Sequence, residues 1–287
     1  MTSPKTLLSA WNLRPRKRLG QNFLSDPSTA KMIVSRSNIT SDDVVLEIGA
    51  GLGSLTIPLA ITAKKVYAVE KDPELLKLLN TELLTHNLSN VELIQKDILN
   101  LDIFDIFNKE GRKLIVAGNL PYNISSQILV QLINQRNYVT RAVLMFQKEL
   151  ASRLISKPSC KDYGRLSVML QYCAELKSMA HIKASMFFPT PKVDSEILEI
   201  IFKDRSNDSV SDEAFLFKVI KASFGRRRKT LRNSLAGSEL NINTKTAAYA
   251  LECSDIDPKR RAETLSVSEF ISLSNNLKDI LTSKSPS

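Results

Sequence analysis

Short apolar runs alternate with longer segments of helical spacing from residue 44 to residue 202. The runs are rich in β-branched side chains and are short enough to be buried strands. Seven of them stand out, at 44–48, 65–69, 91–95, 114–117, 141–146, 166–173 and 196–202. Strands that alternate with helices form a mostly parallel sheet covered on both faces. The pattern therefore predicts an α/β fold.

The later part of the chain has a different pattern. The last two strand candidates have no long helix between them, which predicts an antiparallel strand at the end of the sheet. Residues 203–212 are polar, and no strand pattern follows them. Helical spacing then appears at 213–224, 227–235, 244–253 and 267–281. We predict an α/β domain over residues 1–205 and a smaller all-α domain over residues 206–287.

Two helix starts have recognisable signals. Pro73 follows Asp72, an order typical of a first helical turn behind its cap. Ser125 or Ser126 is expected to cap a helix over 127–134. Both helices follow strand candidates, as the alternating pattern requires.

The composition restricts the kind of protein this is. The 287 residues are 43% hydrophobic, enough for a substantial core, and 40 Lys plus Arg against 30 Asp plus Glu give a formal charge of +10. A basic balance favours a polyanionic partner such as nucleic acid, although lysine-rich surfaces are often only solvated. No apolar run approaches the roughly 18 residues of a membrane span. We expect neither a membrane protein nor a secreted one.

Cysteine and histidine are scarce. The three cysteines are too far apart for a zinc knuckle, and they are typical of a reduced, cytoplasmic protein. With only His86 and His181, neither a histidine metal site nor a Ser/His/Asp arrangement is supported, and we predict no metal. Residues 1–25 are basic and free of acids, as an organellar transit peptide would be, but motif-like residues begin by Gln21.

A glycine-rich turn follows the first strand candidate. Gly49, Gly51 and Gly53 permit a tight turn close to a ligand, and a helical pattern begins at Ser54 with unpaired N–H groups. This predicts a cradle for a nucleotide-like cofactor, with an ordinary strand-to-helix turn as the alternative. The dinucleotide fingerprint needs glycine where Ser54 stands, so nicotinamide binding is disfavoured.

Two carboxylates end the next strand candidates. Glu70 comes about 20 residues after the glycines, the spacing at which a carboxylate meets ribose hydroxyls. Asp97 follows the third strand candidate and is placed to accept a hydrogen bond from an adenine amino group. The alternatives are an ion pair of Glu70 with Lys71 and a helix-capping role for Asp97.

The tetrapeptide after the strand candidate 114–117 is the clearest chemical signal. Active sites of open α/β sheets lie at such strand ends. Asn119 offers a side-chain oxygen and Leu120 a backbone carbonyl, which Pro121 biases towards extended geometry. Two acceptors aimed at an exocyclic amine would make its nitrogen a better nucleophile, and Tyr122 offers a face for stacking a base. The alternative is a Pro-Tyr turn.

These motifs, in this order, resemble S-adenosylmethionine-dependent methyltransferases that act on planar amino groups. The chain resembles the ribosomal RNA adenine dimethyltransferase family from the run Arg-Lys-Arg-Leu-Gly-Gln-Asn-Phe-Leu at Arg16 onward. The resemblance continues through the glycine turn, residues 119–125, 163–167 and 191–195, and the basic run at 226–232. It implies a class I methyltransferase domain with a Rossmann-like, mostly parallel seven-stranded sheet, S-adenosylmethionine as cofactor, and direct in-line methyl transfer.

The resemblance also implies roles for individual residues. The implied cofactor contacts are Asn22, Leu24, Gly49, Gly51, Glu70, Asp97 and Asn119. The implied catalytic residues are Asn119, Leu120, Pro121, Tyr122 and Phe187. Phe187 is the second stacking aromatic in the family, while reasoning from the residues alone does not choose between it and Phe188.

Within the family, the chain is most similar to the bacterial branch that acts on the small ribosomal subunit. That branch dimethylates the N6 amines of two adjacent adenosines in the 3′-terminal hairpin of 16S rRNA, which requires flipped bases. We expect a monomer that acts on 16S rRNA in the small subunit or in an assembly intermediate. The alternatives are a 23S rRNA methyltransferase, which usually has Ile in place of Leu120, a protein-glutamine methyltransferase, and a non-catalytic RNA-binding assembly factor with eroded motifs.

Basic residues gather in three places. The densest group, in which Leu231 and Leu235 would form the apolar face of a helix, consists of Arg226, Arg227, Arg228, Lys229 and Arg232. A second group contains Arg14, Arg16, Lys17 and Arg18, and a third contains Lys259, Arg260 and Arg261. A single group is often only a solvated face. Beside a nucleobase clamp, the three groups predict contacts with RNA phosphates.

Overall fold

The computed structural model describes residues 2–203, 210–226 and 228–283. By its internal contacts the chain divides into two compact units, Met1–Ala151 with Glu175–Phe202, and Ser152–Ala174 with Lys203–Ser287. The boundary predicted between residues 205 and 206 lies outside the described residues. The second unit includes residues 152–174, which the sequence analysis placed in the first domain.

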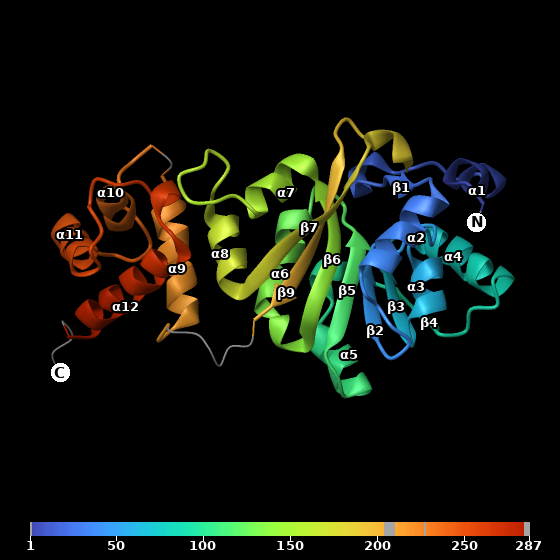
Figure 1. The fold of residues 1–287 in the computed structure, drawn as a ribbon, viewed down its shortest axis with the longest axis horizontal. Helices are drawn as coiled ribbons and strands as arrows, with labels where there is room; N and C mark the ends of the chain where they lie inside the picture. Colours follow the sequence, from blue (N-terminus) through green and yellow to red (C-terminus); the bar gives the residue numbers. More distant parts are fainter. Residues whose placement is uncertain (1, 204–209, 227, 284–287) are drawn as a thin grey trace. The chain divides into compact units, whose positions relative to one another are not determined.

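A seven-stranded sheet with the order β4-β3-β2-β5-β6-β9-β7 forms the centre of the first unit (Figure 1). The strands are β2 (Val44–Ile48), β3 (Lys65–Glu70), β4 (Val91–Gln95), β5 (Leu114–Asn119), β6 (Val139–Gln147), β7 (Ala174–Ile182) and β9 (Ser195–Phe202). The pairs β2·β3, β3·β4, β2·β5 and β5·β6 are parallel, whereas β6·β9 is antiparallel. The α/β fold with a mostly parallel sheet is confirmed.

One strand prediction is wrong. Residues 166–173 belong to the helix α8 (Arg165–Cys173), and the seventh strand is β7, which follows it directly. Most of α8 is buried, so its apolar residues occupy nearly all faces and resemble a buried strand in sequence. The strand β7 was missed because it lies at the sheet edge, where exposed charged residues such as Glu175 replace an apolar run.

Helices precede and separate the strands of the first unit. They are α1 (Pro4–Ala10), α2 (Pro27–Arg36), α3 (Thr56–Thr62), α4 (Pro73–Thr85), α5 (Ile103–Glu110) and α6 (Ser125–Asn134), followed by α7 (Lys148–Leu154), which continues into the second unit. As predicted, Pro73 opens α4 behind Asp72, whose side chain accepts a hydrogen bond from Glu74 N. The serine cap expected for α6 is wrong: Ile124 is its N-cap, and Ser125 Oγ instead donates to Tyr122 O at 3.1 Å.

Shorter elements complete the description. A two-stranded antiparallel sheet joins β1 (Phe23–Leu24) to β8 (Phe187–Phe188). The 3-10 helices are η1 (Lys17–Leu19), η2 (Ile98–Asn100), η3 (Arg136–Tyr138), η4 (Ala184–Met186) and η6 (Ala262–Thr264). A small apolar cluster of α1, β1, the glycine turn and α4 fixes the N-terminal segment against the sheet domain; it contains Leu7, Leu8, Phe23, Leu52, Leu75 and Leu78. Burial of such side chains contributes about 1.5–3 kcal/mol each.

The second unit is helical, as predicted for the C-terminal part of the chain. It contains α8 together with α9 (Glu213–Phe224), α10 (Leu231–Ala236), α11 (Thr244–Cys253) and α12 (Val267–Ser283). The helix expected from residue 227 begins later, at Leu231, so Arg226, Arg228 and Lys229 precede it. Leu231 and Leu235 are buried, which confirms the apolar face. In the described part of the chain, every helix is too short or too polar to serve as a membrane-spanning segment.

Candidate cofactor and amine site

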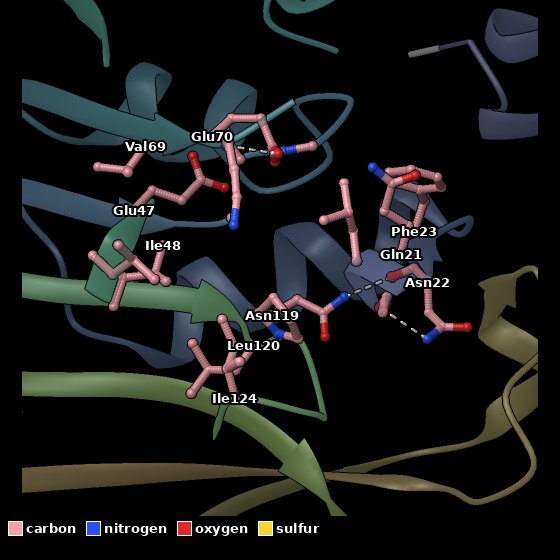
Figure 2. Close-up of a pocket in the computed structure, with 18 of the residues that line it drawn as sticks. Gln21, Asn22, Phe23, Glu47, Ile48, Val69, Glu70, Asn119, Leu120 and Ile124 are labelled. Carbon is pink, nitrogen blue, oxygen red and sulfur yellow. Dashed lines mark hydrogen bonds between the residues drawn. The ribbon is translucent and has the colours of Figure 1, made fainter. Parts of the chain in front are cut away.

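A pocket opens at the carboxyl ends of β2, β3 and β5 (Figure 2). Parallel strands end at the same edge of the sheet, so residues far apart in sequence meet there. The lining includes Asn22, Leu24, Gly49, Gly51, Glu70, Asp97, Asn119, Leu120, Pro121 and Tyr122. The structure thus brings together all the residues predicted to bind the cofactor and to clamp an amine, except Phe187.

The glycine turn has the geometry that the sequence indicated. Gly49, Gly51 and Gly53 all have positive φ, at 74°, 55° and 85°. A Cβ on Gly53 would stand 2.6 Å from Leu79 Cδ1, so a side chain at this position would require Leu79 to shift. The turn is fixed to the neighbouring strand because Gly49 N and Ala50 N both donate to Val69 O, at 2.9 and 3.1 Å.

Glu70 organises this turn from the end of β3. Its Oε2 accepts a hydrogen bond from Gly51 N at 3.0 Å, and its Oε1 accepts from Lys71 N and Asp72 N, both at 2.9 Å. Burial raises the pKa of the Glu70 carboxyl, although these backbone N–H groups oppose the shift. The side chain of Lys71 contacts Asp97 instead, so the alternative of a Glu70–Lys71 ion pair is not observed.

Asp97 lines the pocket while also capping a 3-10 helix. Its Oδ1 accepts from Leu99 N at 3.1 Å at the start of η2. Its Oδ2 lies 2.7 Å from Lys71 Nζ, and this hydrogen bond lowers the pKa of Asp97. The capping alternative is therefore observed together with the pocket position, and the two are compatible because the carboxylate has several acceptor sites.

Glu47 is a pocket residue that the sequence analysis missed. It lies within β2 at 1% exposure, and its Oε2 has no hydrogen-bond partner among the described residues. Burial raises the pKa of Glu47 to about 8. The signal in the sequence was a single acid inside the apolar run Val44–Ile48. Burying an ionisable side chain costs free energy, so its presence in such a run indicates a functional site.

Asn119 lies at the end of β5 with its amide oriented by a contact across the pocket. Its Nδ2 donates to the backbone carbonyl of Asn22 at 2.8 Å (Figure 2). With the NH₂ group engaged in this way, Oδ1 is the end of the amide available as an acceptor. The backbone of the next residue is also held, because Leu120 N donates to Met145 O at 3.3 Å.

Tyr122 is anchored at two points. Its hydroxyl hydrogen-bonds Ser195 Oγ at 2.9 Å, and its carbonyl accepts from Ser125 Oγ. Ser195 is fully buried at the start of β9, which makes it a rigid partner. Burial raises the pKa of Tyr122, so the ring is neutral at physiological pH. The role of Ser195 could not be predicted from the sequence, because the pairing joins residues 73 positions apart.

Phe187 is not part of the pocket lining in the described residues. It is 2% exposed and packs into the main core, where β8 pairs it with Leu24. Phe188 is partly buried and packs against the N-terminal apolar cluster defined above. The stacking role of Phe187 therefore stays a prediction.

Most basic residues of the predicted RNA surfaces are exposed. This holds for Lys17 and Arg18 in the first unit and for Arg226, Arg228, Lys229 and Arg232 in the second. Arg227 lies outside the described residues. Among the described residues of these groups, three arginines are engaged in ion pairs: Arg16 with Asp72 at 3.0 Å, Arg260 with Glu269, and Arg261 with Glu263 at 3.9 Å.

Comparisons with known proteins agree with this geometry. The family model described as ribosomal RNA adenine dimethylase matches residues 12–279. A protein of Desulforapulum autotrophicum named ribosomal RNA small subunit methyltransferase A is 54% identical over 96% of this chain and 97% of its own length. A Bacillus cereus protein of the same name is 41% identical over 95% of this chain and 94% of its own.

Solved structures show the same fold. A dimethyladenosine transferase from Plasmodium falciparum has a TM-score of 0.74 at 27% identity, covering 88% of this chain and 95% of its own. The 23S rRNA methyltransferase ErmE has a TM-score of 0.64 at 24% identity, covering 89% of this chain and 99% of its own. The second similarity supports the fold alone.

The pocket fits the cofactor of these enzymes. A glycine turn close to the pocket, a carboxylate at the end of β3 and a second one after β4 suit a nucleoside. The family match covers most of the chain, and two relatives exceed 40% identity over nearly their whole length. The chain belongs to the ribosomal RNA adenine dimethylase family, whose members are S-adenosylmethionine-dependent methyltransferases of the class I fold.

Proposed function

We propose that the protein transfers methyl groups from S-adenosylmethionine to the N6 amines of two adjacent adenosines in the 3′-terminal hairpin of 16S rRNA. The observation that carries this proposal is the orientation of Asn119 at the pocket, with Nδ2 engaged by Asn22 O and Oδ1 available as an acceptor. The small-subunit names of the relatives support 16S rRNA as the substrate.

Asn119 and Leu120 act on the target amine. Asn119 Oδ1 and the Leu120 carbonyl each accept one of its two hydrogens, which draws the nitrogen lone pair out of conjugation with the ring. When bound, the cofactor supplies a methyl group on a positively charged sulfur. With the cofactor bound, Asn119 and Leu120 would hold the nitrogen lone pair towards that methyl group, so that the N–C bond could form as the S–C bond breaks and solvent could take the displaced N–H proton. Catalysis then comes from positioning and from acceptors placed near the developing charge.

Tyr122 holds the base that presents this amine. A stacked adenine cannot reach a pocket, so the target base must be extruded from the RNA. The ring of Tyr122 is fixed by Ser195 at its hydroxyl and by Ser125 at its carbonyl, so stacking on it costs little additional ordering. Phe187 is proposed as the second stacking ring from the family resemblance, although its side chain is buried here.

The cofactor is held by the residues around the turn. We propose that Glu70 binds the ribose hydroxyls, that Asp97 accepts from the adenine amino group, and that Gly49 and Gly51 allow the backbone to approach. Asn22 and Leu24 close the pocket from the N-terminal segment, which is tied to the turn because Ser54 Oγ donates to Leu24 O at 2.9 Å. In this proposal the turn, the strand ends and the N-terminal segment form one binding site.

The RNA is bound by exposed cations. We assign phosphate contacts to Lys17, Arg18, Arg226, Arg228, Lys229 and Arg232, with Arg227 expected beside them. Such contacts position the RNA without reading its sequence. The protein is proposed to act as a monomer in the cytoplasm. Cys160, Cys173 and Cys253, all among the described residues, form no disulfide, which suits a reducing compartment.

The test is a methylation assay with labelled S-adenosylmethionine and small ribosomal subunits that lack the modification. Digestion of the RNA and mass spectrometry of its nucleosides identify the product and its position. Dimethyladenosine at two neighbouring positions of 16S rRNA is the expected result. Transfer to 23S rRNA, or to protein, would refute the substrate assignment. Binding of cofactor and subunits without any transfer would favour a non-catalytic assembly factor.

A further inference from the structure

Residues 16–24 cross the pocket edge and are tied down at both ends. At the far end β1 pairs with β8, Ser25 N donates to Met186 O at 2.7 Å, and Phe23 packs in the N-terminal apolar cluster. At the near end lies a compact polar network of Arg16, Gln21 and Asp72. We call residues 16–24 the N-terminal strap.

Asp72 is the centre of that network. Its side chain is only 3% exposed. It accepts hydrogen bonds from Arg16 Nη1 at 3.0 Å, from Gln21 Nε2 at 3.1 Å and from Glu74 N at 3.2 Å. Gln21 closes the ring by accepting from Arg16 N at 2.7 Å through Oε1. A buried carboxylate needs such partners, because an unpaired one costs several kcal/mol. The ring therefore fixes the strap to the N-terminus of α4.

The residue after Gln21 contacts the amine clamp. The carbonyl of Asn22 accepts from Asn119 Nδ2 at 2.8 Å, while the Asn22 side chain donates to Gly20 O at 3.2 Å (Figure 2). An amide side chain can present either its oxygen or its NH₂ group. Only the oxygen can accept a hydrogen from a target amine, so the position of the Asn22 carbonyl determines whether Asn119 is correctly oriented.

We propose that Arg16 and Asp72 are positioning residues for methyl transfer, which hold the strap so that the Asn22 carbonyl orients the amide of Asn119. Arg16 is then a structural partner of Asp72 and not a contact of RNA phosphates, unlike its neighbours Lys17 and Arg18. This assignment rests on the proposed function, because it concerns the clamp on the target amine.

The main test compares Arg16→Ala with Lys31→Ala, which removes an exposed cation from α2 in the same unit. Both variants lose one positive charge. For each, kcat, KM for RNA and the dependence of RNA affinity on salt are measured. Arg16→Ala is expected to lower kcat by about tenfold or more, because a misplacement of about 1 Å caused by a mutation far from the chemistry can cost about 100-fold in rate. The dependence of RNA affinity on salt should be the same in Arg16→Ala, in Lys31→Ala and in wild type.

Two further variants separate the ion pair from a general loss of structure. Arg16→Lys keeps a cation that can reach Asp72 and should recover part of the lost kcat. Asp72→Asn keeps a good cap for α4, since Asn is as effective as Asp at this position, but it removes the charge that holds Arg16. It should therefore lower kcat as Arg16→Ala does while the unfolding transition stays cooperative.

A second readout does not depend on catalysis. The side-chain amide of Asn119, assigned in ¹⁵N spectra by its loss in Asn119→Asp, should exchange with solvent faster in Arg16→Ala than in wild type. Unchanged kcat and unchanged amide exchange in Arg16→Ala, with a salt slope reduced by about one, would overturn the inference and return Arg16 to the RNA surface. Failure of wild type to methylate would refute the proposed function, while the amide exchange would still decide whether Arg16 orients Asn119.

Discussion

Asn119 shows how a single side chain acquires a direction that its own sequence position does not impose. An asparagine after a strand can turn either end of its amide to a pocket, and the carbonyl of Asn22, 97 residues away, selects one. The side chain of Tyr122 is likewise held by a distant residue, because its hydroxyl hydrogen-bonds Ser195 Oγ. At the residue scale, the orientation of both side chains therefore depends on partners that are distant in the sequence.

Replacing Asn119 tests the clamp directly. Asn119→Ala removes one of the two acceptors for the amine, so kcat for methyl transfer should fall by about 100-fold or more, by analogy with the loss of one hydrogen bond to a transition state. RNA affinity should change little, because the side chain carries no charge. Asn134→Ala, at an exposed site in α6, is the control. Equal losses of transfer and of RNA binding would contradict the role of Asn119.

Glu47 should make stability depend on pH. Burial raises its pKa from 4.5 to about 8, so between these values the folded state keeps a proton that the unfolded state has lost. The free energy of unfolding therefore falls as pH rises through this window, by up to about 1.4 kcal/mol per pH unit from this group. Glu47→Gln, which stays neutral, should flatten this dependence in urea unfolding curves measured across the window.

A matched variant makes the Glu47 result interpretable. Glu175→Gln removes an exposed carboxyl from β7, and its pH dependence of unfolding should follow wild type. A Glu47→Gln protein with the same slope as wild type would show that Glu47 ionises normally in the folded protein.

At the scale of elements, the turn between β2 and α3 joins the cofactor site to helix packing. Gly53 combines a positive φ of 85° with close contact to Leu79 of α4. The small size of Gly53 therefore lets α4 pack close to the start of α3. Asp72 is the N-cap residue of the same helix α4. The helix that anchors the strap and the turn proposed to cradle the cofactor are parts of one packed arrangement.

Substitution of glycine in this turn separates backbone strain from packing. Gly53→Ala should reduce the free energy of unfolding by about 1–3 kcal/mol through both effects. Gly111→Ala is the matched control, because Gly111 also has a positive φ, of 65°, but no atom within 4 Å of an added Cβ. Urea unfolding of both variants gives the packing contribution as their difference. Equal destabilisation would mean that Leu79 moves aside freely.

At the scale of the whole molecule, the formal net charge is +10. Some of the basic side chains are paired with acids, whereas others are exposed. Lys65 and Lys109 are engaged with Glu92 at the edge of the sheet, and Arg260 pairs with Glu269 in the helical unit. In contrast, Arg228 and Lys229 are exposed before α10. Exposed cations of this kind can reach the phosphates of a polyanion. Their binding is favourable because it releases the counterions condensed on the phosphates.

The salt dependence of RNA binding measures this availability. Arg228→Ala combined with Lys229→Ala should weaken binding and reduce the slope of log affinity against log salt by about two, because each lost phosphate contact releases about one counterion fewer. The control is Lys31→Ala combined with Lys64→Ala, which removes the same charge from exposed sites of the first unit. An unchanged slope in the first variant would exclude Arg228 and Lys229 from the RNA surface.

The sequence by itself determined the α/β class, the helices α9 and α11 with their bounds, the glycine turn and the place of Asn119 where a strand ends. These depend on local periodicity, caps and strand ends, which neighbouring residues encode. Local pattern did not distinguish α8 from a strand, because a helix buried on most sides lacks a polar face. Only the tertiary structure decided which residues meet across the pocket. The Arg16–Asp72 pair, the Asn22–Asn119 contact and the unpaired oxygen of Glu47 all depend on distant segments brought to one edge of the sheet.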